Sequence, residues 1–234
     1  MKKFASVSPL RILEKSSRKG LGPGNLGVLM ARAGVGKTSC LIHIAFDKIC
    51  KREKLVHVSL EEGADKITSY YNVMYSDLAK ALDFSEGLKN DLNIEKDRMI
   101  LAYLKQSFDT ERLRASLKNL KNELDFKAST LIVDGLDFES AERSLFEDFK
   151  QIAAEFNVEI WFSALSHRHI EDVNERGIPY PCHRDDDLFS IIMQLKTEPQ
   201  AVSLQLLKDH DNPTLTDISV RLDPGTFLSK GLKA

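Results

Sequence analysis

The chain has 234 residues, of which 42% are hydrophobic and 29% are charged, and its formal net charge is −2. This length suits one well-buried domain and is short for two, and the composition excludes a disordered or fibrous chain. The near-neutral charge gives no electrostatic reason for nucleic acid or a membrane surface to be an obligatory partner.

The N-terminal segment, MKKFASVSPL, contains no apolar run long enough for the core of a signal peptide. No stretch approaches the roughly 20 apolar residues that cross a bilayer. The three cysteines, Cys40, Cys50 and Cys182, form no disulfide framework and suit a reducing compartment. We therefore expect a cytoplasmic location and no membrane partner.

Predicted strands and helices alternate as far as residue 165. After a turn rich in glycine at 20–25, strands are expected at 26–31, 55–60, 99–104, 130–134 and 158–165. Helices are expected at 37–51, 64–84, 110–124 and 139–156, where apolar residues recur at helical spacing. This alternation predicts an α/β fold with a mainly parallel sheet flanked by helices.

The pattern changes after residue 165. Residues 167–187 form a polar, irregular stretch that is long for a loop of a compact domain. Strands are then predicted at 188–195, 202–208 and 218–222, with connections too short for parallel crossovers, so antiparallel C-terminal strands are expected. We find no internal repeat and no boundary, and expect one domain over 1–234 with a lead-in segment at 1–20.

Residues 31–38, ARAGVGKT, fit the phosphate-binding P-loop, or Walker A motif, with alanine in place of the first glycine. Gly34 and Gly36 let the backbone curl so that successive N–H groups point at phosphate oxygens, and the following helix adds its positive dipole end. Lys37 is expected to neutralise the β- and γ-phosphates, and Thr38 to offer its hydroxyl to Mg²⁺. The groups expected to hold ATP are those of Ala33, Gly34, Val35, Gly36, Lys37, Thr38 and Ser39. The alternative is a chance match in a glycine-containing turn, against which the predicted strand and helix on either side argue.

Acidic residues follow two of the predicted strands. Asp134 ends the run 130–134 and is the candidate Walker B acid that holds Mg²⁺. Asp137 is expected to be solvated or to cap the next helix. Glu61 and Glu62 follow the strand 55–60, at the sheet edge where α/β proteins carry out chemistry, although surface charge at a strand end is also ordinary.

Four segments together resemble the core of RecA-type ATPases, and within them the KaiC, RadA and DnaB branch: GLGPGNLGVLMARAGVGKT, LVHVSLEEG, TLIVDGLD and EIWFSALSH. The resemblance covers about residues 18–222. It implies a RecA-like fold, hydrolysis of Mg-ATP, and a homo-oligomeric ring or filament with nucleotide between subunits.

The resemblance also implies roles for single residues. By position, Glu61 would polarise the water that attacks the γ-phosphate, while Glu62 would be a neighbour able to form a salt bridge or substitute. Successive strand residues point to opposite faces, so both should not aim at one water. Ser166 and His167 stand where relatives carry a group that senses the γ-phosphate, although a surface histidine is the plainer interpretation.

The sequence departs from that family at the C-terminal strands. Ring-forming members insert a lysine–x–arginine pair into the neighbouring site, whereas this chain has Lys208-Asp209-His210. Arginine and neutral histidine are not interchangeable for stabilising phosphate charge. We retain Lys208 as a candidate inter-subunit catalytic residue, and expect hydrolysis to be slow, to need a protein partner or to use another cation.

The stretch 167–187 carries two further patterns. Its basic residues, Arg168, Arg176 and Arg184, are balanced by acids, so DNA translocation is not supported. Its zinc-ligand types, His167, His169, Cys182 and His183, match no common zinc spacing.

Three alternatives to an ATPase stay open. One is a non-hydrolysing, nucleotide-dependent switch that regulates a partner. Another is a small-molecule kinase that uses 167–187 as a lid, against which the position of Glu61 argues. The last is a DNA motor of the recombinase or helicase type.

Overall fold

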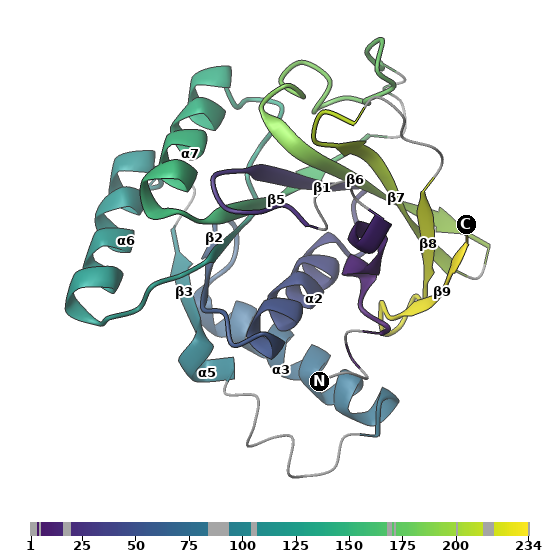
Figure 1. The fold of residues 1–234 in the computed structure, drawn as a ribbon, viewed down its shortest axis with the longest axis horizontal. Coiled ribbons are helices and arrows are strands. Elements are labelled where there is room, and N and C mark those ends of the chain that lie inside the picture. Colours follow the sequence, from purple (N-terminus) through teal and green to yellow (C-terminus); the bar gives the residue numbers. More distant parts are fainter. Residues whose placement is uncertain are drawn as a thin grey trace.

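A computed structural model of the chain describes residues 4, 6–15, 20–83, 94–103, 107–167, 170, 172–199, 201–212 and 218–233. In this part of the chain one sheet holds nine strands in the order β3-β2-β4-β5-β1-β6-β7-β8-β9 (Figure 1). The strands are β1 (Leu26–Ala31), β2 (Leu55–Ser59), β3 (Arg98–Ala102), β4 (Thr130–Asp134), β5 (Glu159–Leu165), β6 (Phe189–Glu198), β7 (Ala201–Asp209), β8 (Ser219–Leu222) and β9 (Ser229–Lys233).

The strands β3, β2, β4, β5, β1 and β6 pair in parallel, whereas β6, β7, β8 and β9 pair antiparallel. This confirms the predicted parallel sheet with antiparallel C-terminal strands. The strand β9 was not predicted, because its sequence, SKGLK, contains a glycine and no clear alternation.

Helices cover both faces of the parallel part of the sheet (Figure 1). The helices are α2 (Lys37–Cys50), α3 (Ala64–Ala81), α5 (Ile94–Asp97), α6 (Thr110–Glu123) and α7 (Arg143–Phe156), and η1 (Pro9–Lys15) is a 3₁₀ helix. One apolar core lies between the sheet and α2, α3 and η1, and a second lies between the sheet and α6 and α7. The side chains of β1 alternate between them: Leu29 packs in the first core, and Val28 and Met30 in the second. In the described residues no helix is both long and apolar enough to cross a membrane.

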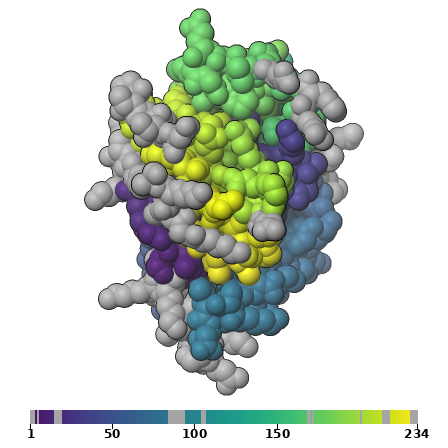
Figure 2. All heavy atoms as spheres, turned by 90° about the vertical axis from the view of Figure 1, so that its right-hand side faces the viewer, coloured from purple at the N-terminus to yellow at the C-terminus, as the bar shows by residue number. Residues whose placement is uncertain are grey.

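The N-terminal segment and the C-terminal strands lie side by side (Figure 2). The Ser229 N–H donates to the Val7 carbonyl at 2.7 Å. Together they cover α2 from the side of the antiparallel strands, so the helix that follows the P-loop is enclosed by segments from both ends of the described chain.

A buried ion pair holds the glycine-rich lead-in turn against the sheet. The Glu159 carboxylate accepts hydrogen bonds from the Gly22 N–H at 3.1 Å and from the Trp161 indole at 3.0 Å, and the Lys48 ammonium lies 2.9 Å away. The ring of Trp161 in turn lies against Gly27 of β1, where an added Cβ would be 2.7 Å from it. These contacts fix where β1 starts, and hence where the loop after it projects.

Candidate functional site

The loop at residues 32–36 joins β1 to α2, so the strand–loop–helix context that the P-loop requires is present. Gly34 and Gly36 have φ values of +74° and +100°, which favour glycine. Gly36 is the N-cap of α2, and no described side chain caps this helix start. Its first N–H groups and the helix dipole therefore form an anion site.

Lys37 lies where its ammonium can reach both the loop and the nearby carboxylates. Its Nζ donates to the Ala31 carbonyl at 3.2 Å. Burial lowers the pKa of Lys37, and the charges of Asp134 and Glu61 oppose this. The three charged groups are thus close enough to influence one another, which concentrates alternating charge at one edge of the sheet.

Thr38 and Asp134 come from different elements and meet at this edge. Thr38 lies in the first turn of α2 and Asp134 ends β4, and the Thr38 Oγ1 donates to Asp134 Oδ2 at 2.8 Å. The other oxygen, Asp134 Oδ1, accepts from the Ser163 hydroxyl at 2.5 Å. Hydroxyl and carboxylate oxygens are ligands that Mg²⁺ prefers, so this pair fits the predicted metal site.

Glu61 lies directly beside the end of β4. A Cβ added to Gly135 would lie 2.5 Å from Glu61 Cγ, so the glutamate side chain packs on the residue that follows Asp134. Gly135 has φ +87°, a second reason for glycine there. The exposed Glu61 carboxylate therefore shares an edge of the site with Thr38 and Asp134.

Glu62 is turned away from Glu61. Its N–H donates to the Ser59 hydroxyl at 3.1 Å, and its carboxylate pairs with Lys66 of α3 at 2.6 Å. The strand β2 ends at Ser59, one residue earlier than predicted, because this hydrogen bond closes a turn. The two glutamates thus diverge at a turn and not through strand alternation.

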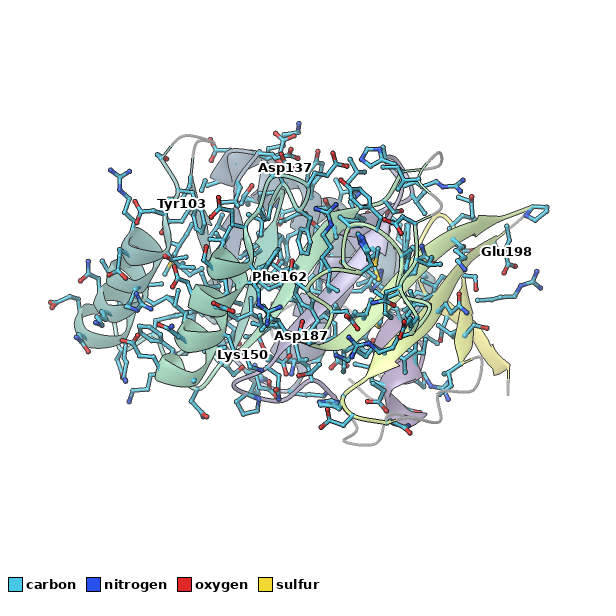
Figure 3. The ribbon with its side chains drawn as sticks, turned by 90° about the horizontal axis from the view of Figure 1, so that it is seen from above. Tyr103, Asp137, Lys150, Phe162, Asp187 and Glu198 are labelled. Atoms are coloured by element: carbon cyan, nitrogen blue, oxygen red, sulfur yellow. The ribbon has the colours of Figure 1, made fainter. Side chains whose placement is uncertain are left out.

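The residues after β4 and β5 line the same edge, which Figure 3 shows with Tyr103 and Asp137 along it. The Ser166 N–H donates to the Ala31 carbonyl at 3.0 Å, beside the start of the P-loop. His167 Nε2 lies 2.5 Å from Glu139 Oε1. Asp137 accepts from the Glu139 N–H at 3.1 Å in a turn that precedes α7, whose N-cap is Glu142, so Asp137 does not cap the helix.

Lys208 lies away from its own P-loop. It pairs with Ile192, which pairs with Val28 in the first half of β1. Its ammonium donates to the Asp186 carbonyl, and burial lowers its pKa. Figure 3 shows Asp187, the neighbour of that carbonyl, towards the opposite edge of the sheet from Asp137. Within one chain, Lys208 therefore cannot reach phosphates bound at 33–38.

His210 is buried and bound within its own chain. Its Nδ1 lies 2.9 Å from Asp209 Oδ1, and its Nε2 lies 3.2 Å from the Leu21 carbonyl. The histidine that replaces the family's arginine thus ties β7 to the lead-in turn. In this arrangement it does not project from the surface.

The described residues of 167–187 hold no group of three or more metal-ligand side chains. His183 pairs with Asp172 at 3.2 Å, and Cys182 is buried. Arg176 pairs with Asp186 at 2.7 Å. Arg168 and His169 lie outside the described residues.

Two contacts at the site were missed from the sequence. The first is Ser163, a polar residue among apolar neighbours in β5 that touches Asp134. The second is Phe227, whose ring packs on Gly36. The apolar setting of Ser163 is a signal that could have been noticed, whereas nothing in the sequence points Phe227 at the P-loop.

No family model matches the sequence, and no curated protein matches it. Among solved structures, the ATPase domain of a DnaB-like helicase matches with a TM-score of 0.69 at 18% identity, over 94% of this chain and 89% of that chain. In all, 550 solved chains match, so the architecture is widely used and does not alone select a function. The likeness shows that the chain has the RecA-like ATPase fold, as predicted.

Proposed function

We propose that this protein binds Mg-ATP and hydrolyses it. The observation that carries the proposal is the meeting of four groups at one sheet edge: the P-loop with Lys37, the Thr38–Asp134 contact, and Glu61 packed on Gly135. The described residues outside this edge offer no second arrangement of this kind. We also propose membership of the KaiC, RadA and DnaB branch and a cytoplasmic location.

Binding would rest on the start of α2. Backbone N–H groups of Ala33 to Ser39 would surround the phosphates, and Lys37 would exchange its carbonyl partners for phosphate oxygens. Thr38 and Asp134 would hold Mg²⁺, which neutralises charge on the β- and γ-phosphates when bound. Ser166, whose N–H is fixed to Ala31, would contact the terminal phosphate.

Hydrolysis would rest on Glu61. A carboxylate that is exposed, near the metal acid and within reach of a water can orient that water and accept its proton. Glu62 is engaged with Lys66, so it is not an equivalent base. A neutral Glu61→Gln variant would keep the shape and lose the proton acceptor.

The direct test is single-turnover hydrolysis of labelled ATP with protein in excess. Glu61→Gln should slow hydrolysis by about 10²–10⁴-fold, the usual contribution of general base catalysis, with ATP affinity retained. Glu62→Gln is the matched control and should hydrolyse at nearly the wild-type rate. Lys37→Ala should lose ATP binding. Equal rates for wild type and Glu61→Gln at every protein concentration would contradict the assignment of Glu61.

We further propose that the active form is a homo-oligomer in which Lys208 of one copy serves the site of its neighbour. The position of Lys208, away from its own loop, supports a role in trans over a role in cis. Mixing two inactive variants, Glu61→Gln and Lys208→Ala, tests this, because some interfaces then contain both intact residues. Random mixing should restore about a quarter of the wild-type rate. No restoration in assemblies shown to contain both variants would contradict it.

The second candidate is a nucleotide-dependent switch without hydrolysis. It is favoured by the two groups that would complete a neighbour's site: Lys208 is held by the Asp186 carbonyl, and His210 is buried. Its signature is ATP binding that changes the mass in solution, with no phosphate release in assemblies. A DNA motor would instead show hydrolysis that rises with single-stranded or duplex DNA at low salt.

A further inference from the structure

Ser163 is a buried polar residue in the middle of β5. The strand lies between β4, which carries Asp134, and β1, which leads into the P-loop. The Ser163 residue is 3% exposed. A polar side chain in such a place requires hydrogen-bond partners, and the choice of partners indicates its role.

Both bonds of the Ser163 hydroxyl go to the end of β4. It donates its single hydrogen to Asp134 Oδ1 at 2.5 Å and accepts from the Gly135 N–H at 3.2 Å. A hydroxyl has one donor, and a carboxylate cannot donate, so the direction of both bonds is determined. The hydroxyl therefore holds two consecutive residues at the proposed metal site.

The two oxygens of Asp134 have different partners. Oδ2 faces Thr38, the other proposed metal ligand, whereas Oδ1 faces Ser163 in the sheet interior. Holding Oδ1 leaves the carboxylate one orientation in which Oδ2 points toward α2. Groups that orient a ligating carboxylate commonly decide metal affinity even though they do not touch the metal.

The second bond extends this effect to Glu61. The Gly135 N–H is fixed by Ser163, and the Glu61 side chain packs on the Gly135 Cα. One hydroxyl thus defines the position of the proposed metal acid and of the surface on which the proposed base rests.

We propose that Ser163 is a positioning residue, which orients Asp134 for Mg²⁺ binding from the interior of the sheet. This inference rests on the proposed Mg-nucleotide site. It does not depend on whether the bound nucleotide is hydrolysed.

The test compares Ser163→Thr with Ser163→Val, which have the same shape and differ in the hydroxyl. A fluorescent ADP analogue is bound in EDTA and then across a Mg²⁺ titration. In EDTA both variants should match wild type within about twofold, because the P-loop is unchanged. The Mg²⁺ concentration for half-maximal tightening should rise by about 10–100-fold in Ser163→Val and stay near wild type in Ser163→Thr.

A merely structural role would lower the thermal midpoint of Ser163→Val without moving its Mg²⁺ midpoint, and that result would overturn the inference. In an Asp134→Asn background the Val substitution should have no further effect on the Mg²⁺ response. Ser190→Ala is the control for loss of a strand hydroxyl, since Ser190 bonds Asn25 at 3.0 Å on another strand. If wild type binds the analogue equally with and without Mg²⁺, the metal role of Asp134 is wrong and this inference falls with it. Absence of hydrolysis alone would leave the inference standing.

Discussion

The ring of Phe227 lies on Gly36, the residue at which the phosphate-binding helix begins: a Cβ added to Gly36 would overlap Phe227 Cζ. Phe227 comes from the connection between β8 and β9, where Asp223 Oδ1 accepts the N–H groups of Gly225 and Thr226. The Thr226 carbonyl bonds His43 of α2 at 2.7 Å. A segment near the C-terminus thus packs on the P-loop of the same chain.

Gly36→Ala is therefore expected to weaken ATP binding more than Gly34→Ala does. Both positions have a φ in the left-handed region, but a Cβ on Gly34 would meet nothing within 4 Å. The difference between the two variants reports the overlap with Phe227 beyond backbone strain, which costs of order 1–3 kcal/mol at each position. Titration calorimetry with ATP measures both affinities. Adding Phe227→Ala to Gly36→Ala should recover part of the loss, and equal affinities for both glycine variants would contradict the contact.

Gly135→Ala should slow hydrolysis and spare ATP binding. The new Cβ would lie 2.5 Å from Glu61 Cγ, so the glutamate must move. The single-turnover rate should approach that of Glu61→Gln, with the ATP dissociation constant within about threefold of wild type. Gly63→Ala is the matched control, because a Cβ there meets nothing within 4 Å and its φ is −69°. A Gly135→Ala rate equal to that of Gly63→Ala would disprove the proposed placement of the base.

The protein should lose stability as the pH falls from about 6.5 to about 4. Burial lowers the pKa of both His43 and His57 from 6.5 to about 4. Between these values the unfolded chain binds more protons than the folded one, so the free energy of unfolding rises with pH. Each histidine contributes an effect of order 2–3 kcal/mol across the window.

Urea unfolding at several pH values measures this slope. His43→Gln keeps an amide to donate to the Thr226 carbonyl and cannot titrate, so it should remove roughly half of the slope. An unchanged slope in this variant would show that His43 is not responsible.

The ion pair between Lys48 and Glu159 should be costly to break from either side. Their side chains are 15% and 6% exposed. Replacing one partner leaves a buried charge without compensation, which typically costs about 3–5 kcal/mol. Lys48→Met and Glu159→Gln should each lower the free energy of unfolding by this amount, and the double variant by less than their sum.

The surface pair of Lys80 with Asp77 provides the comparison, because its side chains are 77% and 47% exposed. Lys80→Met should change stability by less than about 1 kcal/mol. If the two lysine variants are equally stable, Glu159 does not depend on Lys48.

Much of the site could be anticipated because its parts follow apolar runs. The P-loop, Asp134 and Glu61 each come after a strand, and the carboxyl ends of parallel strands share one edge of a sheet. The sequence alone did not show which strands are neighbours; the place of β5 between β1 and β4 followed from the resemblance. The roles of these residues stay predictions, although the structure brings them together.

The rest depends on contacts between distant parts of the chain. Ser163 reads as one polar residue in an apolar strand, and only the register with β4 places it on Asp134. Phe227 follows a turn of ordinary composition, and its contact with Gly36 arises from the path of the antiparallel strands. His210 was compared with an arginine finger, whereas the structure buries it against Leu21.

The strand β5 also acts as a spacer of fixed width. It separates β1 from β4, so the P-loop strand and the strand that carries Asp134 lie two inter-strand steps apart, about 10 Å. The helix α2 contacts β1, β5 and β4, and so its first turn carries Thr38 across that interval to Asp134. The distance between the phosphate loop and its acid is therefore set by a backbone ladder of hydrogen bonds, which substitutions in the surrounding loops cannot lengthen.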